Sequence, residues 1–296
     1  MATLIERVLL VTNPASRRGL KRRPVALEEF KRAGVTVDEL VTSHPGHARD
    51  ILRAGAPQVD AVFVLGGDGA VMEVAGALRG TGIPIGALPG GTGNLVGGSL
   101  GVPRSLRRAV PALLRGVPRK LDLGRIGEDG SCFAFAAGLG IDVDMVIETT
   151  AARKRMLGIL AYVLSAGRSV LRRRMFDVVA EVDGRVVKAR VVLAMVANSG
   201  ALFGGRLLVG PNIQPDDGWL DLCLFTPTTL RQVLGVTWRA LRRDFREHPH
   251  MQFVRGRRIR LASEPETDVQ ADGDVTCRTP IEVTVMPGAG VFLAPS

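Results

Sequence analysis

Two glycine-rich turns, each placed after a short apolar run, constrain the fold of this chain more than any other feature. The apolar residues 61–65 lead into Gly66-Gly67-Asp68-Gly69, and the run ending at residue 88 leads into Pro89-Gly90-Gly91-Thr92-Gly93-Asn94. A helical pattern follows the first turn, with Val71, Val74 and Leu78 on one face. The order strand, glycine turn, helix directs backbone N–H groups at an anion. Two such turns close together indicate a polyphosphate ligand.

Asp68 lies between the glycines of the first turn, where a carboxylate would repel a phosphate. A metal ion or ordered water between the two groups would remove this repulsion. The alternative is an ordinary tight turn between a strand and a helix, which the second glycine turn makes less favoured. The chain has no Gly-x-x-x-x-Gly-Lys-Ser/Thr motif and no Gly-x-Gly-x-x-Gly after its first strand, so the common nucleotide-binding motifs do not apply.

The N-terminal part alternates between strand and helix patterns. Strands are predicted at 5–12, 35–41, 61–65 and 83–88, with helices at about 24–33, 47–55 and 70–79 and a basic loop at 17–23. This alternation predicts an α/β domain, a parallel sheet with helices on both faces. Ligands of such sheets bind beyond the carboxyl ends of the strands. Asn13, Thr42, Asp68 and Thr92 follow strand ends, so we expect them to converge in one crevice.

Strand patterns dominate after about residue 118. Asp183-Gly184 between two alternating runs is a strong hairpin signal. Further strands are predicted at 121–126, 132–136, 176–182, 186–196, 219–225, 257–262, 267–271, 281–286 and 290–294, with helical stretches at about 151–174 and 228–246. This pattern predicts a second, all-β domain that forms a sandwich.

Charge and composition narrow the class of partner. The net charge of +10 favours anionic partners such as nucleotides, nucleic acid or an acidic membrane surface. One Tyr and two Trp are too few aromatics to interleave with the basic residues, which argues against a nucleic-acid binder. The three cysteines are far apart, which is typical of a reduced, cytosolic protein. We expect neither a signal peptide nor a membrane-spanning helix.

Two acidic turns in the second half have two readings each. Pro215-Asp216-Asp217-Gly218-Trp219 fits a type I turn before a strand, and its paired carboxylates could also hold a hard cation. Ala271-Asp272-Gly273-Asp274 fits a hairpin turn, and its carboxylates could also accept a proton from a substrate hydroxyl.

Together these motifs resemble the diacylglycerol kinase catalytic domain, and most closely the bacterial lipid kinases related to sphingosine, ceramide and NAD kinases. The resemblance runs through nearly the whole chain. It rests on Asn13-Pro14, Thr42 with Gly46-His47-Ala48, the two glycine turns with Glu73-Val74, residues 135–142, Asn198, Gly204-Gly205, residues 211–222 and Asp272-Gly273-Asp274.

The resemblance implies an N-terminal α/β domain at 1–120, to which residues 287–296 return, and a β-sandwich substrate domain at 121–286. It implies ATP-dependent phosphorylation of a lipid hydroxyl, as part of phospholipid metabolism. The ATP-binding positions would be Asn13, Pro14, Thr42, Gly66, Gly67, Asp68, Gly69, Ala70, Met72, Glu73, Gly91, Thr92 and Asn94.

The resemblance also implies a Mg²⁺ ion held by Asp217 and the backbone carbonyls of Gln214 and Trp219, with Asp68 linked to it through water. The proton acceptor would be Asp272 or Asp274, and the sequence leaves this choice open. Asp122 matches an acidic position at the start of the second domain.

Three departures from the family pattern bear on activity. Ala70 replaces a Thr, Leu95 replaces an Asp, and Asp274 replaces a Glu. A catalytically weak regulatory paralogue is therefore one alternative. A kinase for a soluble alcohol is another, although the small, largely apolar residues 197–203 favour a lipid.

A lipid kinase must reach a bilayer, so the expected location is cytoplasmic and peripheral at the inner membrane face. Clusters of basic residues could contact anionic lipid, each contributing about 1 kcal/mol near the surface; the alternative is a solvated basic face. These clusters are Arg153-Lys154-Arg155, Arg172-Arg173-Arg174 and Arg239, Arg242, Arg243 and Arg246. A homodimer is one option for the assembly. The sequence decides neither the oligomeric state nor the identity of the lipid.

Overall fold

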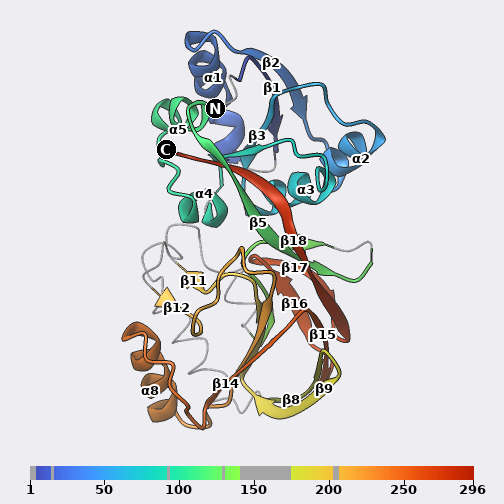
Figure 1. Ribbon diagram of the computed structural model, residues 1–296, viewed down its shortest axis with the longest axis vertical. Helices are drawn as coiled ribbons and strands as arrows, with labels where there is room; N and C mark the ends of the chain where they lie inside the picture. The colour runs from blue at the N-terminus through green and yellow to red at the C-terminus, as the bar shows by residue number, and fades with distance from the viewer. Residues whose placement is uncertain (1–4, 15–16, 92–93, 129–130, 141–174, 203–206) are drawn as a thin grey trace. The chain divides into compact units, whose positions relative to one another are not determined.

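The computed structural model describes residues 5–14, 17–91, 94–128, 131–140, 175–202 and 207–296. The chain divides into two compact units (Figure 1). Unit 1 comprises Met1–Leu121 with Gly288–Ser296, and unit 2 comprises Asp122–Pro287. Thr92 and the basic stretch 151–174 lie outside the described residues.

Unit 1 is built on a parallel sheet with the strand order β2-β1-β3-β4, and the end of β18 (Ile281–Ala294) pairs in parallel with β4. The strands are β1 (Arg7–Thr12), β2 (Thr36–Val41), β3 (Ala61–Gly66) and β4 (Ile85–Pro89). The helices are α1 (Arg17–Arg32), α2 (His47–Ala54), α3 (Asp68–Ala77), α4 (Leu95–Ser99) and α5 (Leu106–Leu114). The predicted α/β class is confirmed.

The central strand β3 explains why this sheet forms. All six of its residues are buried, as expected for a strand covered by helices on both faces. On one face, α1 and α5 pack on the sheet in a shared apolar core. In this core the rings of Phe30 and Phe63 pack edge to face, with their centroids 4.9 Å apart. Helices α2 and α3 pack together at the other side of the sheet (Figure 1). The carboxyl ends of the strands remain as the place where loops gather.

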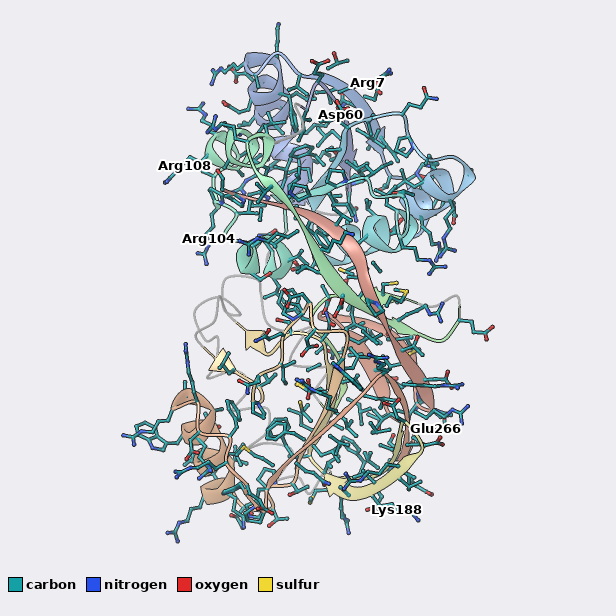
Figure 2. The ribbon with its side chains drawn as sticks, viewed as in Figure 1. Arg7, Asp60, Arg104, Arg108, Lys188 and Glu266 are labelled. Atoms are coloured by element: carbon teal, nitrogen blue, oxygen red, sulfur yellow. The ribbon has the colours of Figure 1, made fainter. Side chains whose placement is uncertain are left out.

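Hydrogen bonds fix the start of β1. The Asp60 carboxylate accepts the backbone N–H groups of Glu6 and Arg7, both at 2.8 Å (Figure 2). The bonds from Arg7 and Glu6 hold the pKa of Asp60 below its ordinary value. The Arg7 guanidinium also pairs with Asp38 of the neighbouring strand at 2.9 Å. The register of β1 between β2 and β3 is therefore set at its first residue.

Helix α1 differs from the prediction. It begins at Arg17, so the predicted basic loop 17–23 is helical, and Pro24 lies inside the helix. Lys and Arg are good helix formers, which allows the basic segment to extend the helix ahead of the proline.

In the described residues of unit 2, two large sheets enclose an apolar core, and a separate small sheet pairs β11 with β12. One sheet has the strand order β14-β13-β10-β7-β16-β17, and the other has β18-β15-β8-β9, with β5 beside β18 and β6 beside β5. The elements are β5 (Val117–Ile126), β6 (Cys132–Phe133), β7 (Ala136–Leu139), β8 (Phe176–Val182), β9 (Arg185–Val191), β10 (Leu193–Ala197), β11 (Ala201–Leu202), β12 (Leu207–Leu208), β13 (Leu220–Phe225), α8 (Leu230–Leu241), β14 (Met251–Gly256), β15 (Arg258–Glu264), β16 (Asp268–Ala271) and β17 (Asp274–Arg278). The predicted β-sandwich is confirmed.

Several boundaries in unit 2 differ from the predictions. The predicted strand 186–196 is two strands, β9 and β10, which belong to different sheets. The predicted strands 281–286 and 290–294 are one strand, β18. Strands β14 and β17 were not predicted, and α8 ends at Leu241 rather than near 246. No helix in the described part of the chain is long and apolar enough to cross a membrane.

Candidate functional site

The two glycine turns of unit 1 lie backbone against backbone. A Cβ atom on Gly91 would be 2.5 Å from the Cα atom of Gly67, and one on Gly90 would be 2.6 Å from the backbone nitrogen of Gly66. Both distances are far below a van der Waals contact, so only glycine fits. The turns follow adjacent parallel strands, in which Gly66 pairs with Pro89. The glycines are therefore required by this close approach.

Two side chains hold the second turn in place. The Asn94 amide accepts the Gly91 N–H and donates to the Gly91 carbonyl, both at 2.9 Å. Asn94 has a left-handed backbone with φ of 48°, which Asn tolerates better than most residues. From α1, the Arg22 guanidinium donates to the Pro89 carbonyl at 2.9 Å. The turn is thus tied to the helix that follows it and to α1.

Asp68 is the first residue of α3 and is 9% exposed. Its Oδ1 atom accepts the Val96 N–H at 3.0 Å, at the start of α4. This bond links the first glycine turn to the helix after the second turn. A carboxylate at a helix N-terminus is also favoured by the helix dipole. The side chain of Ala70 lies over Gly66, since a Cβ atom on Gly66 would be 2.9 Å from that of Ala70.

Asn13 and Thr42 lie at the same edge of the sheet. The Asn13 N–H donates to the Leu65 carbonyl at 3.4 Å, and the Thr42 N–H donates to the Thr12 carbonyl at 3.0 Å. Thr42 is buried, and Pro14 follows Asn13 in the turn after β1. The structure therefore brings Asn13, Thr42 and Asp68 to the carboxyl ends of adjacent strands.

Two further ATP-binding candidates in α3, Glu73 and Met72, have different surroundings. The Glu73 carboxylate accepts the Arg49 N–H at 3.1 Å and so links α3 to the first turn of α2. Met72 is 4% exposed and packs in the interior. Glu73 thus ties α3 to α2, while the Met72 side chain contributes to packing.

In unit 2, the turn before β13 is organised by Asp122. The Asp122 N–H donates to the Pro215 carbonyl and its Oδ2 atom accepts the Gly218 N–H, both at 2.6 Å. Asp217 accepts the Trp219 N–H at 3.1 Å. These bonds fix the segment that carries the predicted magnesium ligands.

Arg255 of β14 adds a cation to this turn. Its guanidinium binds both oxygens of Asp221, at 3.1 and 3.0 Å, and lies 3.3 Å from Asp217. It also donates to the Asn212 carbonyl at 2.9 Å. Burial raises the pKa of Asp221, and the Arg255 hydrogen bonds oppose this shift. No local pattern pointed to Arg255, because β14 was not predicted and Arg255 lies 34 residues from Asp221.

The donor atoms of this turn suit a hard cation. Two carboxylates, those of Asp217 and Asp221, lie beside one guanidinium, and Mg²⁺ prefers oxygen ligands. Within the described ranges, no group of three His, Cys, Asp or Glu side chains could hold a metal. An ion at Asp217 would therefore need backbone carbonyls such as those of Gln214 and Trp219, and it would compete with Arg255 for the carboxylate.

The turn between β16 and β17 separates its two aspartates. Asp272 and Gly273 both have left-handed backbones, with φ of 50° and 97°, as in a tight two-residue hairpin. The Asp272 carboxylate accepts the N–H groups of Ala134, Phe135 and Ala136 at 2.7 to 3.1 Å. Asp274 is exposed. Asp272 therefore holds the segment that leads into β7, and the exposed carboxylate belongs to Asp274.

Comparison with known proteins agrees with this architecture. Residues 7–126 match the family profile "Diacylglycerol kinase catalytic domain". Residues 136–293 match the profile "YegS C-terminal NAD kinase beta sandwich-like domain".

Two relatives named diacylglycerol kinase match over almost their whole length. A diacylglycerol kinase of Mycobacterium tuberculosis is 31% identical, covering 98% of this chain and 96% of the relative. A diacylglycerol kinase of Bacillus subtilis is 27% identical, with coverages of 91% and 90%. A crystal structure of a Bacillus anthracis protein assigned as a diacylglycerol kinase superposes with a TM-score of 0.80 at 26% identity, covering 99% and 97% of the two chains. The chain therefore belongs to the diacylglycerol kinase-like family of lipid kinases.

Proposed function

We propose that this protein transfers the γ-phosphoryl group of ATP to the hydroxyl of a membrane lipid alcohol, with Mg²⁺ as the metal. The observation that carries the proposal is the pair of interlocked glycine turns at the carboxyl ends of β3 and β4. Their backbone can approach a polyphosphate closely because no side chain intervenes. The names of the relatives support a lipid acceptor.

In this proposal the nucleotide binds along Asn13, Thr42 and the two turns. Phosphoryl transfer depends mainly on positioning and on electrostatic stabilisation of the transferring group. The bonds from Asn94 and Arg22 support that role, because they fix the second turn before ATP binds. A turn held in this way loses little conformational freedom on binding.

Mg²⁺ would be held by Asp217 and the carbonyls of Gln214 and Trp219, and when bound it would neutralise negative charge on the phosphates. A metal or water beside Asp68 would also reconcile that carboxylate with a bound phosphate. Asp122 supports this assignment by fixing the backbone of the turn at Pro215 and Gly218.

We assign the proton acceptor to Asp274 rather than Asp272. Three backbone N–H donors already occupy the Asp272 carboxylate, which gives it a structural role in holding residues 134–136. Asp274 is exposed at the start of β17. In the reaction the lipid oxygen forms a bond to the γ-phosphorus, the bond from that phosphorus to the β–γ bridging oxygen breaks, the hydroxyl proton passes to Asp274, and ADP leaves.

The experiment is phosphate transfer from radiolabelled ATP to a panel of acceptors in mixed micelles. The panel contains diacylglycerol, sphingosine and ceramide, with NAD and glycerol as soluble alcohols. We expect label in at least one lipid and loss of transfer when EDTA removes magnesium. Label only in a soluble alcohol would favour the soluble-substrate kinase, and no transfer to any acceptor would favour the regulatory paralogue.

A further inference from the structure

Helix α8 of unit 2 exposes a continuous apolar stripe. Four large side chains are exposed on this twelve-residue helix: Leu230 by 46%, Leu234 by 54%, Trp238 by 58% and Leu241 by 41%. Their spacing of four, four and three residues places them on one face. Four large apolar side chains in one row form a surface patch that a soluble protein rarely leaves uncovered.

The stripe belongs to a well-formed helix. Thr229 and Gln232 make a capping box at its start, in which the Thr229 hydroxyl accepts the Gln232 N–H at 3.3 Å. The opposite side is anchored by Val233, which is 2% exposed, and by Val236, which packs on the adjacent apolar cluster. A different face of α8 therefore packs on unit 2. The helix itself lies at the outer side of that unit (Figure 1).

The charged residues from the start of α8 to residue 243 are all positive. Arg231, Arg239, Arg242 and Arg243 fall within residues 230–243, which contain no Asp or Glu. The Arg242 guanidinium lies over the Trp238 ring at 4.9 Å. Asp244, just beyond the helix, is paired with Arg239 and Arg246. An apolar face with a cationic border matches an anionic lipid surface.

We propose that α8 docks in the plane of an anionic bilayer and inserts this stripe, Leu230, Leu234, Trp238 and Leu241, at the headgroup level. Trp favours that depth because its ring is apolar and its N–H stays near water. A second copy fits the face less well, because a two-fold contact would bring the arginines of both copies together. The proposal rests on the lipid kinase function, which requires access to a bilayer.

The test is co-sedimentation of the full chain with vesicles of phosphatidylglycerol and phosphatidylcholine. The double variant Leu234→Gln/Trp238→Gln should bind about ten-fold more weakly or worse. Val186→Gln is the matched control, because Val186 is also 58% exposed but lies on β9. We expect the control to bind like the wild type, and binding by the wild type to fall with salt and on pure phosphatidylcholine. Equal binding by the double variant and the wild type would overturn the proposal.

Two further readouts separate the outcomes. In Trp219→Phe, Trp238 is the only Trp of the chain, and its fluorescence should shift to the blue when vesicles are added. Wild-type self-association that the double variant loses, with no vesicle binding by either, would assign the face to a second copy and contradict docking. Phosphorylation of a detergent-dispersed lipid should be as fast in the double variant as in the wild type. If the wild type phosphorylates no lipid, the kinase function is refuted, and the vesicle experiment still tests the docking of α8.

Discussion

Two aspartates on one hairpin turn illustrate how the local environment divides roles between like residues. Asp272 is committed to three backbone N–H groups of residues 134–136, and Asp274, two positions later, is exposed. Charge-assisted bonds of this kind are among the stronger hydrogen bonds in proteins. We therefore expect Asp272 to act on structure and Asp274 on the reaction.

Asparagine substitutions test this division. Asp274→Asn should lower kcat by about 10²- to 10⁴-fold, the usual range for loss of a general base. Asp272→Asn should lower the free energy of unfolding by about 1–3 kcal/mol, because its neutral amide cannot replace all three charged bonds. Steady-state kinetics and thermal unfolding measure both. A stable, fully active Asp274→Asn variant would contradict the assignment.

At the scale of elements, the glycine turns behave as one unit. Each turn ends its own strand, and the backbone of Gly90 and Gly91 fills the space beside Gly66 and Gly67. Asp68 adds a bond from the first turn to α4. This edge of the sheet is consequently sensitive to added volume, because a methyl group at Gly90 or Gly91 would overlap backbone atoms of the first turn.

Gly91→Ala should lower the free energy of unfolding by about 1–3 kcal/mol, the usual cost of overpacking, because its Cβ would meet the Gly67 backbone. Gly98→Ala in α4 is the control, since a Cβ there meets nothing within 4 Å. This control should be neutral or stabilising by up to about 1 kcal/mol, as Ala favours helix. Urea unfolding measures both changes. Equal stability of the two variants would show that the turns do not interlock.

Across the whole molecule, the excess of basic residues makes paired carboxylates important for acid stability. The net charge is +10, and Glu282 of β18 bonds to Arg258 and Arg260, both at 2.8 Å. The bonds from Arg258 and then Arg260 lower the pKa of Glu282 from 4.5 to about 2. A depressed carboxylate pKa stabilises the folded state above the unfolded value, and this contribution disappears as the pH falls through the folded value.

Glu282→Gln should therefore lower the melting temperature at pH 7 and reduce the further loss between pH 4.5 and pH 2. Glu266→Gln, at an exposed residue ahead of β16, is the control and should follow the wild-type pH profile (Figure 2). Thermal unfolding from pH 7 to pH 2 gives both profiles. If the melting temperature of Glu282→Gln falls with pH in parallel with that of the wild type, the ion pairs of Glu282 do not contribute to acid stability.

Local patterns explain which parts of the fold were predictable. Apolar strands followed by glycine turns carry their signal within a few residues, so the parallel sheet and the gathering of Asn13, Thr42 and Asp68 at its edge follow from sequence. The start of α1 did not, because its basic residues hide the apolar pattern, and the strands β14 and β17 did not, because they are short and mix polar with apolar residues.

Long-range partners explain what was missed at the site. Asp272 bonds to Ala134, 138 residues away, and Arg255 bonds to Asp221, 34 residues away. No local pattern reports such pairs, so the sequence left the choice between Asp272 and Asp274 open. The three N–H bonds to Asp272 supply the physical reason to favour Asp274.

The most direct test of the proposed function is transfer of radiolabelled phosphate from ATP to diacylglycerol by the wild type and by Asp68→Asn. Asp68 links the first glycine turn to α4 through the Val96 N–H, and its carboxylate carries the charge that a metal or water must separate from a bound phosphate. We predict that the wild type forms labelled phosphatidic acid. The rate of transfer by Asp68→Asn should be lower by about a hundred-fold or more. Wild-type transfer by a folded Asp68→Asn protein would contradict the account.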